Sequence, residues 1–111
     1  MKTALKEILT DLLADARAHR GRAFAQPLRG GLSIHIRVTS DDMCHLEISR
    51  VDIAPDPSEW KTVTELLGAP GGTTYIERQP EMPGKPYSRR VESGRIYLVG
   101  EWQLQTELIS Q

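Results

Sequence analysis

Two histidines and a glutamate, which can carry acid-base or metal chemistry, lie together with an arginine in the middle of this 111-residue chain. His35 and Arg37 alternate with apolar residues in one segment, and His45 and Glu47 do the same in the next. Two imidazoles and a carboxylate can bind a transition metal, and a histidine oriented by a carboxylate can act as a general base. Because residues two apart share a face of an extended strand, each pair projects from one side of its strand. These four residues are therefore the first candidate site.

The two segments predict a β-hairpin that sets the geometry of this site. If residues 40–42 form a three-residue loop, His35 lies opposite Glu47 and Arg37 lies opposite His45. On the other face the same register pairs Ile34 with Ile48, Ile36 with Leu46, and Val38 with Cys44. The histidines are then diagonal neighbours, and the guanidinium of Arg37 repels a cation held by His45. We interpret the four residues as a polar surface cluster and predict neither a metal nor another cofactor. A small enzyme or metal site on this hairpin is the weakest alternative.

A second candidate site is an arginine-rich run between residues 17 and 29. It holds Arg17, Arg20, Arg22 and Arg29, and the chain has no acidic residue from 16 to 40. Such a run can contact nucleic-acid phosphates independently of base sequence. However, Phe24 is its one aromatic residue available for stacking, and positive charge is also typical of the carboxyl end of a helix. A second basic cluster, at 85–95, would reinforce the run if the fold brought the two together.

Most patterns typical of enzymes are absent from the sequence. It has no CxxC pair, HExxH helix or phosphate loop, and no serine, histidine and aspartate set with catalytic spacing. The single cysteine, Cys44, excludes an intrachain disulfide and is predicted to be buried because it falls in an apolar row. The formal net charge of −1 gives no overall attraction to nucleic acid or an anionic membrane. We therefore do not predict an enzyme.

Two helices are predicted to support the hairpin. Apolar residues recur at helical spacing over residues 2–19, with charged residues on the opposite side. A second, shorter helix begins after Asp56, which is a predicted cap with Pro57 at the first helical position and Glu59 completing a capping box. Trp60 falls on the apolar face of this helix, and Gly68 is placed to end it. Between hairpin and helix the apolar parity flips, which predicts a bulge or strand end near residues 49–50.

The remaining sequence is predicted to form strands. These are 73–78, 87–91 and 95–99, with the last running on to 104 through Trp102, and with a turn at Ser93 and Gly94. Both tryptophans coincide with apolar periodicity and are predicted to be buried. Prolines recur every third residue from 80 to 86, which favours a stiff connector over a ligand for a polyproline-binding domain.

The sequence thus predicts a single α+β domain over residues 1–111. Its mainly antiparallel sheet carries an N-terminal amphipathic helix and a second short helix on one face, in the order α-β-β-α-β-β-β. The leading functional hypothesis is a small intracellular accessory or binding module that acts through protein-protein contact, including a homodimer through the apolar first helix. The alternative is a nucleic-acid-binding accessory protein. Because the sequence shows neither a signal peptide nor a membrane span, we expect a cytoplasmic location.

Overall fold

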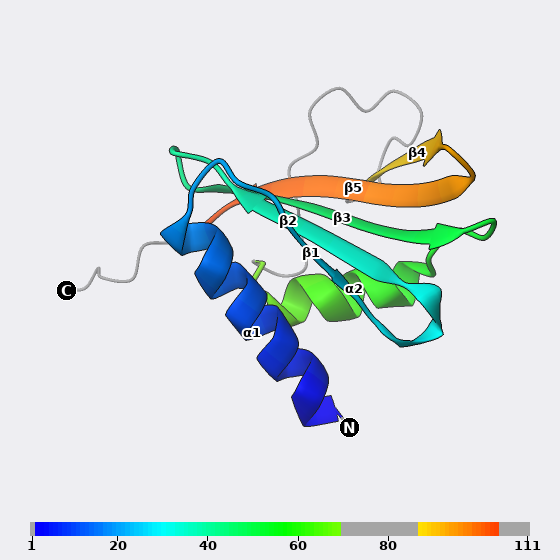
Figure 1. Cartoon of the computed structure of the whole chain (residues 1–111), viewed down its shortest axis with the longest axis horizontal. Coiled ribbons are helices and arrows are strands. Elements are labelled where there is room, and N and C mark those ends of the chain that lie inside the picture. Colours follow the sequence, from blue (N-terminus) through cyan, green and yellow to red (C-terminus); the bar gives the residue numbers. More distant parts are fainter. Residues whose placement is uncertain (1, 70–86, 105–111) are drawn as a thin grey trace.

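Five strands form one antiparallel sheet, and two α-helices lie on one of its faces, within residues 2–69 and 87–104, which the computed structural model of the chain describes (Figure 1). The strand order across the sheet is β1-β2-β3-β5-β4. The elements, in chain order, are α1 (Lys2–Ala18), β1 (Phe24–Pro27), the 3-10 turn η1 (Arg29–Gly31), β2 (Ser33–Val38), β3 (Met43–Val51), α2 (Pro57–Leu66), β4 (Ser88–Glu92) and β5 (Arg95–Gln103). The predicted α+β class is confirmed, with the observed order α-β-β-β-α-β-β.

The predicted hairpin register is confirmed residue by residue. Ile36 pairs with Leu46, His35 with Glu47 and Arg37 with His45. The amide of Asp42 donates to the carbonyl of Thr39, and Asp42 takes a positive φ of 64°, as the last residue of a three-residue hairpin loop commonly does. The apolar partners on the other face are fully buried, including Cys44. This hairpin is the centre of the sheet, and its apolar face forms the floor on which the helices pack.

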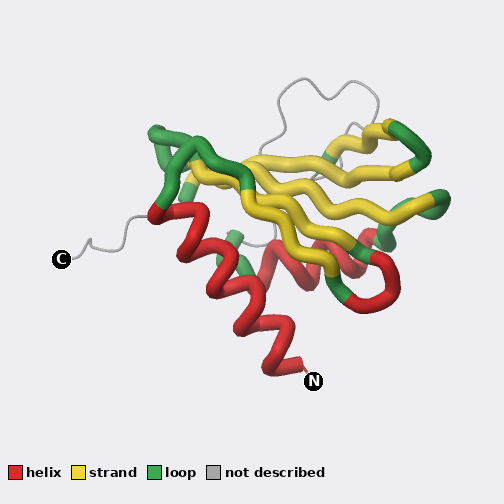
Figure 2. Tube along the Cα trace, in the orientation of Figure 1, coloured by secondary structure: helices red, strands yellow, loops and turns green. Residues whose placement is uncertain are grey.

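Both helices bury their predicted apolar faces against that floor. In α1, Leu9, Leu12 and Ala16 enter the core. In α2, Asp56 caps the helix in the predicted capping box with Glu59, and Trp60 is buried to 1% exposure. Gly68 ends α2 with a positive φ of 85°, a backbone conformation that other residues rarely adopt. Figure 2 shows both helices on the same side of the yellow strands.

Strand β1 lies between the first predicted helix and the predicted hairpin, where the sequence analysis predicted no strand. It pairs with β2, with Phe24 opposite Ile36 and Pro27 opposite Ser33. Its four residues give little periodicity, and a proline is unfavourable in the middle of a sheet. Because β1 is an edge strand, Pro27 can end it without costing a ladder hydrogen bond to a further strand. Tertiary pairing with β2 therefore creates a strand that local sequence does not specify.

Near residues 49–50 the sequence predicted a bulge or a strand end; there is no bulge, and β3 ends at Val51. Strand β3 pairs with β5 in one unbroken register as far as Val51 opposite Arg95. The apolar parity flips for a different reason: Arg50 occupies the position facing the helices and forms an ion pair with Glu59 of α2. Val51 then lies on the opposite face and is 55% exposed.

The last two strands follow their prediction. Strands β4 and β5 pair with Glu92 opposite Arg95, and the turn residues Ser93 and Gly94 both have positive φ, as a two-residue hairpin turn requires. Trp102 is buried in the even-numbered row of β5, as predicted. The predicted strand at 73–78 and the proline-spaced segment at 79–86 lie outside the described residues. Over the ranges 2–69 and 87–104, no helix is long and apolar enough to cross a membrane.

Candidate functional site

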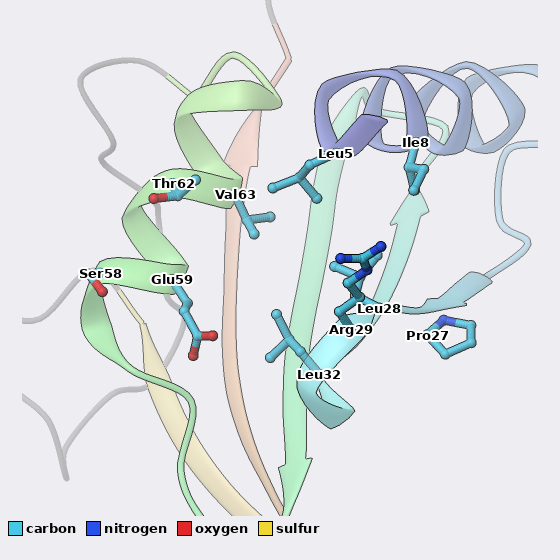
Figure 3. Close-up of a pocket in the computed structure, with 10 residues that line it drawn as sticks. All are labelled: Leu5, Ile8, Pro27, Leu28, Arg29, Leu32, Ser58, Glu59, Thr62 and Val63. Carbon is cyan, nitrogen blue, oxygen red and sulfur yellow. The ribbon is translucent and has the colours of Figure 1, made fainter. Parts of the chain in front are cut away.

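An open groove of about 700 Å³ lies on the helix-bearing side of the sheet, between α1, α2 and the connection from β1 to β2 (Figure 3). Helix α1 contributes Leu5 and Ile8 on one side, and α2 contributes the opposite wall. Figure 3 shows Leu5, Val63 and Leu32 directed into the space from α1, α2 and the β1–β2 connection, whereas the side chains of Ser58 and Thr62 point away from it. The residues lining the groove are Leu5, Ile8, Pro27, Leu28, Arg29, Leu32, Ser58, Glu59, Thr62 and Val63.

Burial is graded from the floor of the groove to its rim. Leu32 and Val63 are buried at the floor, and Leu28 on the wall is half-buried. Pro27 and Thr62 at the rim are exposed. A lining that is apolar below and polar at the edge suits an occupant with an apolar side and a wet side. The volume also lies within the range of about 300–1,000 Å³ that is typical of ligand sites.

Arg50 holds two walls of the groove at a fixed separation. Its Nε donates to the carbonyl of Gly30 at 3.1 Å, and its two terminal nitrogens donate to the two carboxylate oxygens of Glu59. Gly30 and Gly31 turn the chain with φ values of 74° and 80°, which places that carbonyl within reach. The end of β3 therefore ties the turn η1 to the first turn of α2.

The charges around the groove do not balance. Glu59 is neutralised by Arg50, whose hydrogen bonds are the main reason that the pKa of Glu59 is lowered; partial burial opposes that shift. The same carboxylate accepts from the amide of Asp56. Arg29, by contrast, has no ion-pair partner or side-chain hydrogen bond within the described residues that surround it. The groove consequently carries one positive charge at its rim with no counter-charge from the described part of the chain.

The polar surface cluster lies on the other face of the sheet. His45 is the centre of a chain of charges there: its Nδ1 contacts Glu101 at 2.9 Å and its Nε2 contacts Glu47 at 3.0 Å. Glu47 also accepts from Arg90 of β4, whose guanidinium stacks 4.2 Å from the ring centre of Tyr97. The predicted cluster is thus joined by residues from β4 and β5.

The protonation of His45 follows from its two partners. Ionised carboxylates only accept hydrogen bonds, so the contacts to Glu47 and Glu101 favour the form of His45 in which both ring nitrogens carry a proton. The hydrogen bond to Glu47 is the largest cause that raises the pKa of His45, the bond to Glu101 adds to it, and partial burial opposes both. The hydrogen bond from His45 is likewise the main cause that lowers the pKa of Glu47 to about 2. A doubly protonated imidazole has no lone pair for a metal or for a substrate proton.

The other two members of the polar surface cluster lie beside this chain of charges. His35 pairs across the sheet with Glu47 in the backbone register, but its Nδ1 is buried without a hydrogen-bond partner in the described part of the chain. Arg37 lies opposite His45 as predicted, whereas the hydrogen bonds of His45 go to the two glutamates. Within 2–69 and 87–104, no group of three or more histidine, cysteine, aspartate or glutamate side chains could hold a metal ion.

The arginine-rich run is divided by the fold. Arg20 forms an ion pair with Asp42 at the loop between β2 and β3, and Arg22 stacks over Phe24. Strand β1 then carries the chain away from this end, so that Arg29 lines the groove. The four arginines therefore do not form one continuous patch. Nucleic-acid binding by these residues stays a prediction.

Of the second basic cluster, the described Arg95 lies at the other end of the sheet, beside the turn between β4 and β5. The turn between β4 and β5 is fixed by a hydrogen bond from Asp52 to Gly94, beyond the end of β3 that is remote from the loop at Asp42. Arg95 beside this turn donates to Ser49 and Ser33 on the open face. Arg20 and Arg22 are therefore remote from Arg95, whereas Arg29, which follows β1, lies toward the same end of the sheet as Arg95.

Sequence reasoning did not find the groove, although it identified several of its residues. Leu5 and Ile8 appeared in the apolar face of α1, and Arg29 in the arginine-rich run. The sequence feature that could have indicated the groove is the pair Leu28 and Leu32, which flank the turn that contains the two glycines and face the same space. Glu101 was not predicted as a partner of His45. The two residues meet because β5 pairs with β3 in the sheet, and local sequence does not specify that strand order.

Comparisons of the chain with protein-family models, with curated protein sequences and with solved structures give no match.

Proposed function

We propose that this protein is a non-enzymatic binding module that receives an apolar segment of a partner protein in the groove between α1 and α2. The observation that carries this proposal is an open groove with an apolar floor, whose walls are held in place by the rest of the fold. Arg50 ties η1 to α2 on one side, and Leu9 and Leu12 anchor α1 in the core on the other. Because both walls are anchored, the space is a preformed site, and preformed sites lower the ordering cost of binding.

The chemistry on the two faces favours binding over catalysis. On the open face, the groups suited to acid-base work are engaged with one another, and His45 has both ring nitrogens committed. Among the described residues that line the groove, Glu59 is the one carboxylate, and it is paired with Arg50 and caps α2. The same set of residues contains no histidine or cysteine. A groove of aliphatic side chains with a polar rim supports recognition of another apolar surface.

A protein segment fits the groove better than an enclosed small molecule. Small-molecule sites usually bury about 70–90% of the ligand. Here Pro27, Ser58 and Thr62 at the rim are exposed, so an occupant would keep one side in contact with water. This partial exposure is natural for a segment that remains attached to a larger protein.

Site-specific photocrosslinking in cells of the native host tests this proposal. A photoreactive phenylalanine analogue at Thr62, on the groove rim, is compared with the same analogue at the exposed Thr10 of α1, which does not line the groove. We expect one discrete protein adduct from position 62 and none from position 10. The partner, identified by mass spectrometry and purified, should bind the unmodified protein directly.

Two groove variants complete this test. Ile8→Glu places a charge in the wall, and Pro27→Arg fills the exposed rim without touching the core. Both should abolish the adduct and the purified interaction, with circular dichroism confirming that each variant is folded. The proposal is overturned if folded variants bind the partner normally, or if positions 62 and 10 give the same adducts.

A further inference from the structure

We infer that the segment received by the groove is an amphipathic helix carrying an acidic residue that pairs with Arg29. This inference rests on the proposed function and adds the chemistry of the partner. Two separate properties of the lining support it: the groove recognises side chains and offers few backbone hydrogen bonds, and its charge is positive.

The backbone around the groove favours a helical occupant. An extended peptide must satisfy its own N–H and C=O groups, usually by pairing with a strand edge. Pro27, the part of edge strand β1 that lines the groove, has no N–H to donate. The amide of Leu28 is already bonded to Leu32, and the carbonyl of Gly30 to Arg50. A helix satisfies its backbone internally and presents only side chains, which is what this lining can contact.

The arrangement of the helices leaves room for such an occupant. Figures 1 and 3 show that α1 and α2 do not run side by side, so the helical layer over the sheet is incomplete between them. A third helix laid there would place aliphatic side chains, spaced three and four residues apart, against Ile8, Leu28 and Val63. It would bury apolar surface that now faces water.

The positive charge of the groove favours acidic residues beside the apolar stripe of that helix. Glu59 and Arg50 cancel, which leaves the guanidinium of Arg29 to set the sign of the potential at the rim. Figure 3 shows this guanidinium directed toward α1, over the apolar floor. An acidic residue beside the apolar stripe of the occupant would meet it, whereas a basic residue would be repelled. The occupant is therefore an acidic amphipathic helix.

Two fluorescein-labelled helical peptides test this inference. Both contain leucines spaced three and four apart among alanine and glutamine, with no basic residue. In one, glutamates flank the leucine stripe, and in the other glutamines of the same shape replace them. Fluorescence anisotropy with the full-length protein should show tighter binding of the glutamate peptide by about threefold, the size expected for an exposed ion pair. Added salt should remove this preference.

The matched protein variants are Arg29→Ala and Arg22→Ala. Arg29→Ala should erase the preference while leaving the affinity for the glutamine peptide unchanged. Arg22→Ala removes the same charge away from the groove and should keep the preference. Equal binding of the two peptides, or a preference that survives Arg29→Ala, would overturn the inference.

A neutral fluorescent probe separates this inference from the proposed function. N-phenyl-1-naphthylamine is apolar and uncharged, and its fluorescence rises in apolar sites. If the unmodified protein binds this probe and Ile8→Glu does not, but neither peptide binds, the acidic helix is the wrong occupant and the groove remains a binding site. If the probe does not bind at all, the groove is not accessible in solution and the proposed function itself fails.

Discussion

The two faces of the sheet are built from the same strands in the same register. Their polar groups differ in how far they are hydrogen-bonded and ion-paired with one another. On the open face, Glu47 accepts from both His45 and Arg90, and Glu101 accepts from the other nitrogen of His45. On the helix-bearing face, Arg50 and Glu59 pair at the margin of an apolar core, and Arg29 stands at the groove without a counter-charge from the described residues. The charges at the centre of the open face are paired with one another, whereas Arg29 at the groove has no such partner among the described residues.

This difference shows that a concentration of titratable residues in the sequence does not by itself predict free hydrogen-bonding groups in the structure. The histidines and glutamates of the open face look reactive in the sequence, yet their hydrogen-bonding capacity is largely consumed within the sheet. The groove contains mostly aliphatic residues, but its apolar surface and its positive charge are the features left unsatisfied. Recognition depends on what a structure leaves unpaired more than on which residue types it contains.

The largest expected difference between the faces concerns packing. Leu46→Ala, at a fully buried position on the helix-bearing face, should lower the free energy of unfolding by about 2–5 kcal/mol because it leaves a cavity. Met43→Ala on the same strand removes a half-buried side chain from the open face and should cost much less. Urea unfolding of both variants provides the measurement. Similar losses would show that the open face is packed as closely as the core.

A smaller difference is expected between the two arginine-glutamate pairs. Arg50→Met breaks a bidentate pair that also tethers Gly30, and should lower the free energy of unfolding by about 1–2 kcal/mol. Arg90→Met breaks a more exposed pair with Glu47 on the open face and should cost about 0.5 kcal/mol. Both are measured by chemical denaturation. A larger effect for Arg90 would mean that the open face, not the groove wall, depends on its ion pair.

The smallest expected effect is a pH dependence of the free energy of unfolding that arises from the charges of the open face. The pKa of His45 is raised above its ordinary value of 6.5 in the folded protein, so folding favours the protonated imidazole. Its contribution to stability is fully present below that value and is lost as the pH rises through the raised pKa. The stability of the unmodified protein should therefore fall relative to His45→Gln over this range.

The same experiment also tests Glu47, whose contribution to stability changes at low pH. Its folded pKa of about 2 lies below the ordinary 4.5, so its contribution is present above 4.5 and is lost as the pH falls toward 2. Urea unfolding at a series of pH values follows both arms. Parallel stability profiles for the unmodified protein and His45→Gln would show that the two glutamates do not hold the imidazole in its charged form.

Local sequence was sufficient for the central hairpin and for the short helix. Strand periodicity and loop length together fixed the pairing of Ile36 with Leu46, because a slip of one residue would have exposed both apolar rows. Asp56, Pro57 and Glu59 marked the start of α2 because a capping box uses only neighbouring backbone groups. The buried positions of Trp60 and Trp102 followed from the same periodicity.

The features that sequence reasoning missed all depend on partners distant in the chain. Strand β1 exists because β2 offers it a ladder, and four residues ending in proline carry too little local preference to reveal this. The parity change at Arg50 resembled a bulge because its partner, Glu59, lies across the fold on α2. The groove needs α1, η1 and α2 to be placed together, and no local pattern specifies that placement.

Local sequence therefore predicts the strand and helix periodicities, the hairpin register, the cap of α2 and the apolar rows that form the core. These are set by interactions between near neighbours or by the simple requirement to bury apolar residues. Local sequence does not predict that β5 brings Glu101 to His45, that the arginine-rich run is divided, or that Arg29 stands over an apolar groove. Those outcomes depend on strand order and helix placement, which arise when all the elements pack together.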